Sequence, residues 1–270
     1  MTPLRFAKMS GAGNDFVVLD SEAARMLPPD PSAWVRGVCR RGMSVGADGV
    51  LIVTPSGPGR VRVDFFNPDG SAAFCGNGTR CAARFASVRG WCGDRAVLTT
   101  AVGEVPAEIR DSRVRLTLPP PRDMGMRTLS AHGERFEGRL VDSGVPHFVV
   151  LVEDVALVPL SVIGPILRAD PAWGAAGANV DVISEAQGGV WRVRTWERGV
   201  ENETLACGTG AVAAALAARL AGAGERVLIL PASGVELAVT LPGDPGAPAS
   251  AVLEGDARFV FEGTLAAEAL

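Results

Sequence analysis

Cys75-Gly76-Asn77-Gly78-Thr79 occurs a second time, with small changes, as Cys207-Gly208-Thr209-Gly210-Ala211. An alanine-rich run follows each copy and predicts a helix that ends at Gly90 or at Gly222. Each cysteine is therefore expected at a helix N-terminus, where unpaired backbone N–H groups and the helix dipole favour an anion. A thiol in that position is expected to have a pKa below its free value of about 8.5. Two such thiols, brought face to face, would form a pair of acid–base groups.

The repetition extends beyond the cysteines. Phe148 corresponds to Phe16 (148 − 16 = 132), and Cys207 corresponds to Cys75 at the same offset (207 − 75 = 132). Glu197 answers Asn67 at an offset of 130. A nearly constant offset is the signature of an internal duplication. We expect two homologous halves, residues 1–118 with Cys75 and residues 119–255 with Cys207, and a C-terminal strand at about 256–270 that can return to the first half.

The alternation of short apolar segments and turns predicts an α+β fold. Each half is expected to hold a curved, mostly antiparallel sheet or barrel around a central helix, because the run 211–218 is apolar on all sides. Pro119-Pro120-Pro121 is the predicted linker. The predicted helices are 31–42, 81–87, 158–168 and 211–221. The predicted strands are 4–9, 16–20, 49–54, 60–66, 96–100, 104–110, 113–118, 138–141, 148–153, 179–184, 190–196, 227–231, 235–241, 252–254 and 257–261.

Composition narrows the functional classes. The chain of 270 residues is 47% hydrophobic and 21% charged, which is ordinary for a globular protein. A net charge of −4 offers no basic surface for nucleic acid or an anionic membrane. The apolar run 211–218 is too short to span a bilayer, which needs about 20 residues. Five cysteines, an odd number, suit a reducing compartment. We therefore expect a cytoplasmic protein that binds neither nucleic acid nor membrane.

The sequence also predicts that no metal or organic cofactor is bound. Only two histidines are present, and no Cys-x2-Cys pair occurs, so a zinc site would have to be built mostly from scattered thiols. Pyridoxal phosphate needs a lysine for its Schiff base, and Lys8 is the single lysine of the chain.

Paired helix-start thiols suit one kind of reaction in particular. Removing the α-proton of an amino acid without an imine cofactor requires a base on one face of the carbon, an acid on the other, and preorganised donors for the carboxylate. A thiolate, a thiol and the N–H groups after each cysteine would supply all three. A single cysteine is more often a small buried hydrophobe, but the duplicated motif favours catalysis. Cys39, Cys81 and Cys92 have no counterpart in the repeat and are expected to be packing residues.

Several segments resemble the diaminopimelate epimerase family, a group of cofactor-independent two-cysteine enzymes of lysine and peptidoglycan synthesis. The resemblance runs from about residue 5 to 262 and rests on 11–16, 67–71, 75–81, 146–147, 195–199 and 206–210. It implies two similar halves with the active site in the cleft between them, a small amino-acid substrate, no cofactor and a homodimer.

The resemblance also implies roles for individual residues. Cys75 and Cys207 would be the two catalytic bases, with His147 and Glu197 tuning them. The reacting carboxylate would bind at Gly76, Asn77, Gly208 and Thr209, and the rest of the substrate at Asn14, Asn67, Asn179, Glu197 and Arg198. Without the resemblance, His147 would be taken for a structural loop residue and the pair Glu197-Arg198 for a surface pair.

One position departs from the family pattern, and two rival functions stay open. Many family members carry an asparagine before the Pro-His pair that touches the far end of the substrate, and this chain has Val145. A racemase for a different amino acid is therefore an alternative. A redox dithiol protein is a more distant one, which the lack of a Cys-x-x-Cys motif disfavours.

Overall fold

The computed structural model describes residues 4–269. The chain forms two compact units, Met1–Leu116 with Gly255–Leu270, and Thr117–Glu254. Each unit is an α+β structure built on one sheet, and each is described by itself.

The sheet of the first unit begins with the C-terminal strand β20 (Arg258–Leu265), which pairs with β1 (Leu4–Gly11). Successive neighbours are β2 (Asn14–Asp20), β3 (Gly49–Gly57), β4 (Arg60–Phe66), β6 (Arg95–Thr100), β7 (Gly103–Arg110) and β8 (Arg113–Leu118). The pairs β2–β3 and β4–β6 are parallel and the other pairs are antiparallel. The short strand β5 (Ala72–Ala73) pairs with β4. The described residues of this unit also form the α-helices α1 (Ser21–Ala24), α2 (Ser32–Val38) and α3 (Gly76–Val88), and a 3₁₀ turn at Ala267–Ala269.

The sheet of the second unit has the same order of connections. It runs through β9 (Arg122–Ala131), β10 (Glu134–Asp142), β11 (Pro146–Leu151), β12 (Asn179–Glu185), β13 (Val190–Glu197), β15 (Arg226–Pro231), β16 (Leu237–Thr240) and β19 (Ala251–Asp256). The parallel pairs are β11–β12 and β13–β15. Strand β14 (Asn202–Thr204) pairs with β13, and β17 (Gly243–Asp244) with β18 (Ala247–Pro248). The helices are α4 (Leu160–Arg168) and α5 (Gly208–Leu220), with 3₁₀ turns at Val155–Leu157, Pro171–Trp173 and Gln187–Gly189.

The duplication read from the sequence is visible in the strand registers. Phe16 lies opposite Gly49 in the parallel pair of the first unit, and Phe148 lies opposite Val180 in that of the second. Strand β20 takes beside β1 the place that β9 takes beside β10. The first unit therefore needs the C-terminal strand to complete the same sheet.

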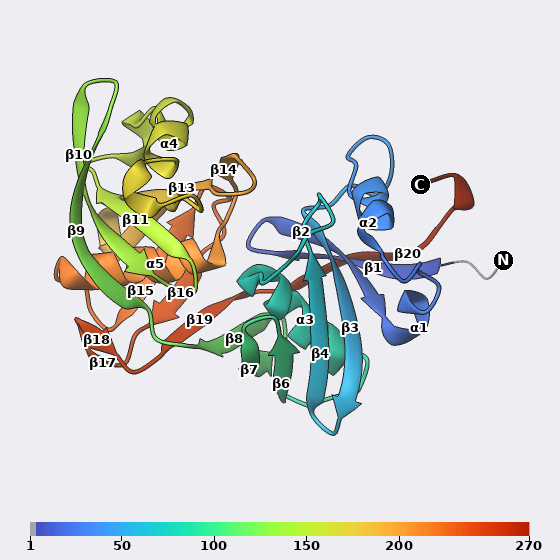
Figure 1. The fold of residues 1–270 in the computed structure, drawn as a ribbon. Coiled ribbons are helices and arrows are strands. Elements are labelled where there is room, and N and C mark those ends of the chain that lie inside the picture. Colours follow the sequence, from blue (N-terminus) through green and yellow to red (C-terminus); the bar gives the residue numbers. More distant parts are fainter. Residues whose placement is uncertain (1–3, 270) are drawn as a thin grey trace. The chain divides into compact units, whose positions relative to one another are not determined.

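In each unit one long helix runs against the sheet, α3 in the first and α5 in the second (Figure 1). Helix α5 contacts β10, β11, β12, β13, β15 and β16, and α3 contacts β1, β2, β3, β4, β6 and β7. Alanines on nearly all sides of α5 are buried, because small side chains let the surrounding strands approach closely. Each helix is thus the centre of its unit.

The structure corrects several predicted boundaries. Helix α3 begins at Gly76 and not at residue 81, and α5 begins at Gly208 and not at 211, because each cysteine itself caps the first turn. Helix α2 ends at Val38 and does not extend to Gly42. Strand β9 follows the proline segment, where the sequence predicts no strand, and the short helix α1 was not predicted either. Within residues 4–269, no helix is both long and apolar enough to cross a membrane.

Gly164 of α4 provides a test of the packing in the second unit. A Cβ atom at this position would lie 2.7 Å from Cγ of the buried Trp196. We expect Gly164→Ala to lower the free energy of unfolding by about 1–3 kcal/mol, the usual cost of overpacking, despite the better helix propensity of alanine. The measurement is the free energy of unfolding of the whole protein in urea, followed by tryptophan fluorescence.

Gly224→Ala is the matched control, since nothing lies within 4 Å of a Cβ at Gly224. Its free energy of unfolding should stay within about ±0.5 kcal/mol of that of the unchanged protein, which is the range of a neutral surface substitution. Equal effects of the two substitutions would contradict the packing described here.

Candidate active site

Cys75 caps the first turn of α3. The Gly78 N–H donates to Sγ at 3.4 Å, and the Cys75 carbonyl accepts from both the N–H and the hydroxyl of Thr79 at 2.8 Å. The thiol is partly buried, while Gly76 and Asn77 beside it are buried. The sulfur therefore lies among the first N–H groups of the helix, which lack partners in the helix itself.

Asn77 and Asn14 are joined by a side-chain hydrogen bond in the first unit. Arg80 Nη2 donates to Asn77 Oδ1 at 3.0 Å, so the Asn77 amide nitrogen faces Asn14 and donates to its Oδ1. The Asn14 amide in turn donates to Asp48 Oδ2 at 3.1 Å. Arg80 is fully buried, and burial lowers the pKa of its guanidinium. These contacts fix the two asparagines next to the cysteine.

Asn14 contacts a cluster of charged side chains through Asp48. Lys8 Nζ forms an ion pair with Asp15 at 2.7 Å and donates to the Gly46 carbonyl, and Arg41 bridges Asp15 and Asp48. Burial alone would raise the pKa of Asp15, but the hydrogen bonds from Arg41 and Lys8 outweigh it and hold the pKa below its usual range. The only lysine of the chain is thus engaged in an ion pair within the first unit.

Asn67 lies in the turn that follows β4. Its carbonyl accepts the Gly70 N–H at 2.9 Å, and its side-chain amide donates to Ser71 Oγ at 3.0 Å. The side chain is partly exposed.

Cys207 has the same place on α5 that Cys75 has on α3. The Gly210 N–H donates to Sγ at 3.4 Å, and the Thr209 hydroxyl lies 3.3 Å from Sγ. Gly208 is buried, and the Ser143 hydroxyl donates to the Thr209 carbonyl at 2.9 Å. The duplicated motif therefore produces the same capping geometry in both units.

His147 connects to Cys207 through Thr209. The ring is completely buried, with Nδ1 2.6 Å from Asp181 Oδ2 and Nε2 3.0 Å from the Thr209 hydroxyl. Asn179 Nδ2 lies 3.1 Å from the same Nε2. The Thr195 hydroxyl donates to the other oxygen of Asp181 at 2.6 Å. A continuous line of polar side chains thus runs from Thr195 to the thiol.

Glu197 and Arg198 lie at the end of β13. The Arg198 backbone N–H donates to Asn179 Oδ1 at 2.7 Å, and its guanidinium lies 3.4 Å from the Gly177 carbonyl. Glu197 accepts a hydrogen bond from the Thr204 hydroxyl at 2.9 Å. The second unit therefore brings His147, Asn179, Thr209 and Cys207 into direct contact, with Arg198 joined through its backbone.

The expectation of a lowered thiol pKa is wrong for Cys207. Burial raises its pKa well above the ordinary value, and the nearby carboxylates of Glu197 and Asp181 raise it further. Hydrogen bonds from Thr209 and Gly210 oppose this shift but do not overcome it. The helix N-terminus is outweighed here because the thiolate would lose solvation and would add a third negative charge near two carboxylates.

Sequence reasoning missed Asp181, Thr195 and the role of the Thr209 hydroxyl. Asp181 stands in the otherwise apolar run 180–183, and a carboxylate in a buried strand is a signal for a buried polar partner. Thr195 begins the segment 195–199 that resembles the family, but the sequence assigns it no role of its own. In the described residues, no group of three or more His, Cys, Asp or Glu side chains is arranged to hold a metal ion.

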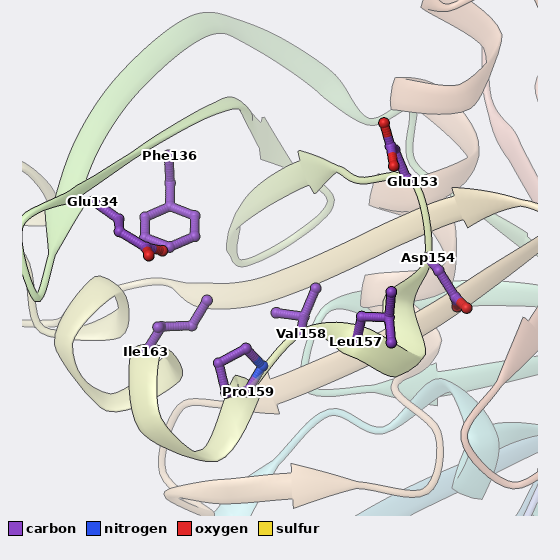
Figure 2. Close-up of a pocket in the computed structure, with 8 residues that line it drawn as sticks. All are labelled: Glu134, Phe136, Glu153, Asp154, Leu157, Val158, Pro159 and Ile163. Atoms are coloured by element: carbon purple, nitrogen blue, oxygen red, sulfur yellow. The ribbon is translucent and has the colours of Figure 1, made fainter.

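A pocket of about 300 Å³ lies elsewhere in the second unit (Figure 2). Glu134 and Phe136 come from β10, and Ile163 comes from α4. The other lining residues come from the segment that leads into α4: Glu153, Asp154, Leu157, Val158 and Pro159. The lining holds no thiol, imidazole or amide side chain, so this pocket lacks the groups that the predicted chemistry needs.

Comparison with known proteins gives one family. Residues 6–119 and 139–260 match the family model described as diaminopimelate epimerase. The diaminopimelate epimerase of Aquifex aeolicus is 39% identical over 280 residues, which cover 99% of each chain. That of Methanothrix thermoacetophila is 37% identical over 286 residues, which cover 100% of this chain and 99% of the relative.

Solved structures share the fold at lower identity. A hydroxyproline epimerase from Agrobacterium vitis, solved with trans-4-hydroxy-L-proline, has a TM-score of 0.73 and 20% identity, and the match covers 98% of this chain and 92% of that one. A phenazine biosynthesis protein of the PhzF family from Bacillus anthracis has a TM-score of 0.71 and 14% identity, with 98% and 100% covered. Together with the nearly full-length sequence matches, this shows that the chain is an isomerase of the diaminopimelate epimerase family.

Proposed function

We propose that this isomerase interconverts LL- and meso-2,6-diaminopimelate by two-base chemistry, in which a thiolate removes the α-proton and a thiol delivers a proton to the opposite face of the carbon. The observation that carries the proposal is the duplicated cysteine, which caps the central helix of each unit with the same N–H contact at 3.4 Å. A two-base reaction needs one such group for each face of the α-carbon. The proposed role places the reaction in the biosynthesis of lysine and of peptidoglycan precursors.

The two thiols have different tasks in each direction. One cysteine, as a thiolate, takes the α-proton, and the other, as a thiol, delivers a proton to the opposite face. Because burial, Glu197 and Asp181 raise the pKa of Cys207, we assign Cys207 as the thiol in the enzyme without substrate. An approaching α-ammonium group would offset the carboxylates and make its thiolate accessible during the reverse reaction.

The carboxylate next to the reacting carbon would bind to backbone N–H groups at the N-termini of α3 and α5. Negative charge builds up on it as the proton leaves, and the N–H groups of Gly76, Asn77, Gly208 and Thr209 are donors of fixed direction. We assign the remaining substrate groups to Asn14, Asn67, Asn179, Glu197 and Arg198, whose guanidinium suits a carboxylate through two parallel hydrogen bonds.

The proposal extends to cofactor use, assembly and location. We propose that the reaction needs no pyridoxal phosphate, which the ion pair of Lys8 with Asp15 at 2.7 Å supports, because that lysine is already committed. We also propose a cytoplasmic homodimer. Light scattering tests the dimer, and activity after dialysis, chelation and hydroxylamine treatment tests cofactor independence.

The test of the function is α-proton exchange in D₂O with LL- and meso-diaminopimelate as substrates. Deuterium entering the α-position during interconversion supports the proposal. Exchange with another amino acid, and none with diaminopimelate, would favour the racemase alternative raised by Val145.

Cys75→Ser and Cys207→Ser should each abolish net epimerisation, with a loss on the order of 10²–10⁴-fold or more, because each direction needs both a base and an acid. A serine hydroxyl can still donate a proton but is a far weaker base than a thiolate. Each variant should therefore retain exchange only with the stereoisomer whose α-hydrogen faces the remaining cysteine. NMR of the two substrates in D₂O measures this.

Cys92→Ser is the matched control, since this partly buried cysteine has no counterpart in the repeat, and it should keep full activity. Full epimerisation by either catalytic variant would exclude two-base chemistry.

The raised pKa of Cys207 predicts slow alkylation in the enzyme without substrate. Only the thiolate reacts with iodoacetamide, so the rate at Cys207 should be low at pH 7–8 and should rise as the pH passes above 9. Peptide mass spectrometry follows each cysteine separately. Buried Cys39, whose pKa is raised to about 11, serves as the slow reference, and urea-unfolded protein as the fast one. A Cys207 rate independent of pH between 6 and 8 would contradict the assignment.

Two thiols that act on one carbon should also be able to form a disulfide. We expect mild oxidation to link Cys75 with Cys207 and to inactivate the enzyme, and a reductant to restore it. Mass spectrometry of the inactive form gives the linkage. Inactive protein with both thiols free, or with a linkage to Cys39, Cys81 or Cys92, would count against a shared reaction centre.

A further inference from the structure

The hydrogen-bond partners of Asn179 show which ring nitrogen of His147 carries the hydrogen. The Arg198 backbone N–H can only donate, and it lies 2.7 Å from Asn179 Oδ1. The other end of this amide, Nδ2, therefore faces the ring at 3.1 Å. An amide nitrogen is a donor only, so Nε2 of His147 must accept and carries no hydrogen.

Asp181 fixes the other side of the ring. Its Oδ2 lies 2.6 Å from Nδ1, and a carboxylate accepts hydrogen bonds, so the hydrogen sits on Nδ1. The ring and the carboxylate are both completely buried, and Thr195 donates to the second oxygen at 2.6 Å. His147 is thus a neutral ring of one defined tautomer.

The first unit shows that the fold itself does not require this carboxylate. Asp181 lies opposite Val149 in β11–β12, and its counterpart Val50 lies opposite Val17 in β2–β3. Val50 is completely buried. Burying a carboxylate where a valine fits costs free energy unless hydrogen bonds satisfy it. The difference between the two units therefore indicates a task that only the second has.

That task concerns the single hydrogen of the Thr209 hydroxyl. Two acceptors lie within reach of it, Nε2 of His147 at 3.0 Å and Sγ of Cys207 at 3.3 Å. Nε2 has one lone pair, and the Asn179 amide also donates a hydrogen bond to it. The hydroxyl can therefore turn away to the sulfur without leaving Nε2 unpaired.

We propose that Asp181 is a positioning residue that holds His147 in the Nδ1–H tautomer, so that the Thr209 hydroxyl can serve both protonation states of Cys207. With Cys207 as a thiol, S–H donates to Thr209 Oγ1 and the hydroxyl donates to Nε2. After the thiol has given its proton to the α-carbon, the hydroxyl rotates and donates to the thiolate, while Asn179 keeps Nε2 paired. No other proton moves.

The opposite tautomer would disable this switch. An Nε2–H group would meet the Asn179 amide donor to donor, and it would donate to Thr209 Oγ1 in competition with the thiol. Cys207 would then lose its acceptor in the protonated state, which is the state that the proposed acid role requires. The kinetic tests of this inference rest on the proposed function, whereas the tautomer of His147 does not.

The direct test is ¹⁵N NMR of the histidine rings. The chain holds only two, and exposed His132 is an internal reference. His147 should show the Nδ1–H tautomer near pH 7, and Asp181→Asn should shift it toward Nε2–H. An Nε2–H or doubly protonated ring in the unchanged protein would overturn the proposal, whatever the enzyme's activity. So would Asp181→Asn with an unchanged tautomer.

The second test is a double-mutant cycle in the epimerase assay. Asp181→Asn and Thr209→Val should each lower kcat on the order of 10²–10³-fold, and the double variant should lose no more than the worse single one, because both act through the same hydroxyl. Additive losses would mean that Asp181 does not act through Thr209.

Two further readouts separate positioning from charge and from folding. A pure charge effect of Asp181→Asn would speed alkylation of Cys207 and spare kcat. Thr195→Val removes a buried hydrogen bond to the same carboxylate but leaves the Nδ1 contact, so it should lower thermal stability and keep the tautomer. If Thr195→Val matches Asp181→Asn in tautomer and in kcat, the role of Asp181 is structural only. Absence of epimerisation in the unchanged enzyme would refute the proposed function and leave the NMR result standing.

Discussion

A helix enclosed by a sheet must satisfy its first N–H groups without help from bulk water. Both central helices face this constraint, and both meet it with a sulfur atom that accepts one of these N–H groups at the cap. The sulfur is a weak acceptor, and in both units it accepts the third N–H group of the helix at 3.4 Å. An Asp or Ser side chain usually caps a helix start. Here a cysteine does so, and each unit therefore has a thiol next to backbone N–H groups of the kind that bind an anion.

The halves share a scaffold but differ in how they support the cap. In the first, Asn77 is fixed by Asn14 and the buried Arg80, above a cluster of charges that includes Lys8 and Asp15. In the second, Thr209 occupies the position of Asn77 and His147 that of Asp15, and His147 contacts Asp181. Two carboxylates raise the pKa of Cys207, and different groups support the cap of the first unit. The two thiols can therefore differ in proton affinity, which a reaction with distinct acid and base requires.

The sequence was informative wherever a local pattern carried the information. The repeated cysteine motif predicts the capped helices, and the constant offset predicts two similar sheets, which the registers at Phe16 and Phe148 confirm. The predictions that failed concern properties set by residues elsewhere in the fold. A helix start predicts a lowered thiol pKa, but burial raises the pKa of Cys207, and carboxylates from the neighbouring strands β12 and β13 raise it further. Strand β9 was missed because its polar residues alternate irregularly, and its pairing with β10 supplies what its side chains do not.

The return of β20 to β1 has a consequence for how the protein is made. The second unit is continuous in sequence, whereas the first waits for residues 258–265 before its sheet has all its strands. During synthesis the later half can therefore complete its structure before the earlier one, and β1 leaves the ribosome long before its outer partner exists. An unpaired strand of this kind invites pairing with other chains. The nascent polypeptide is thus most exposed to misassembly at its beginning, and it depends on its last strand to end that exposure.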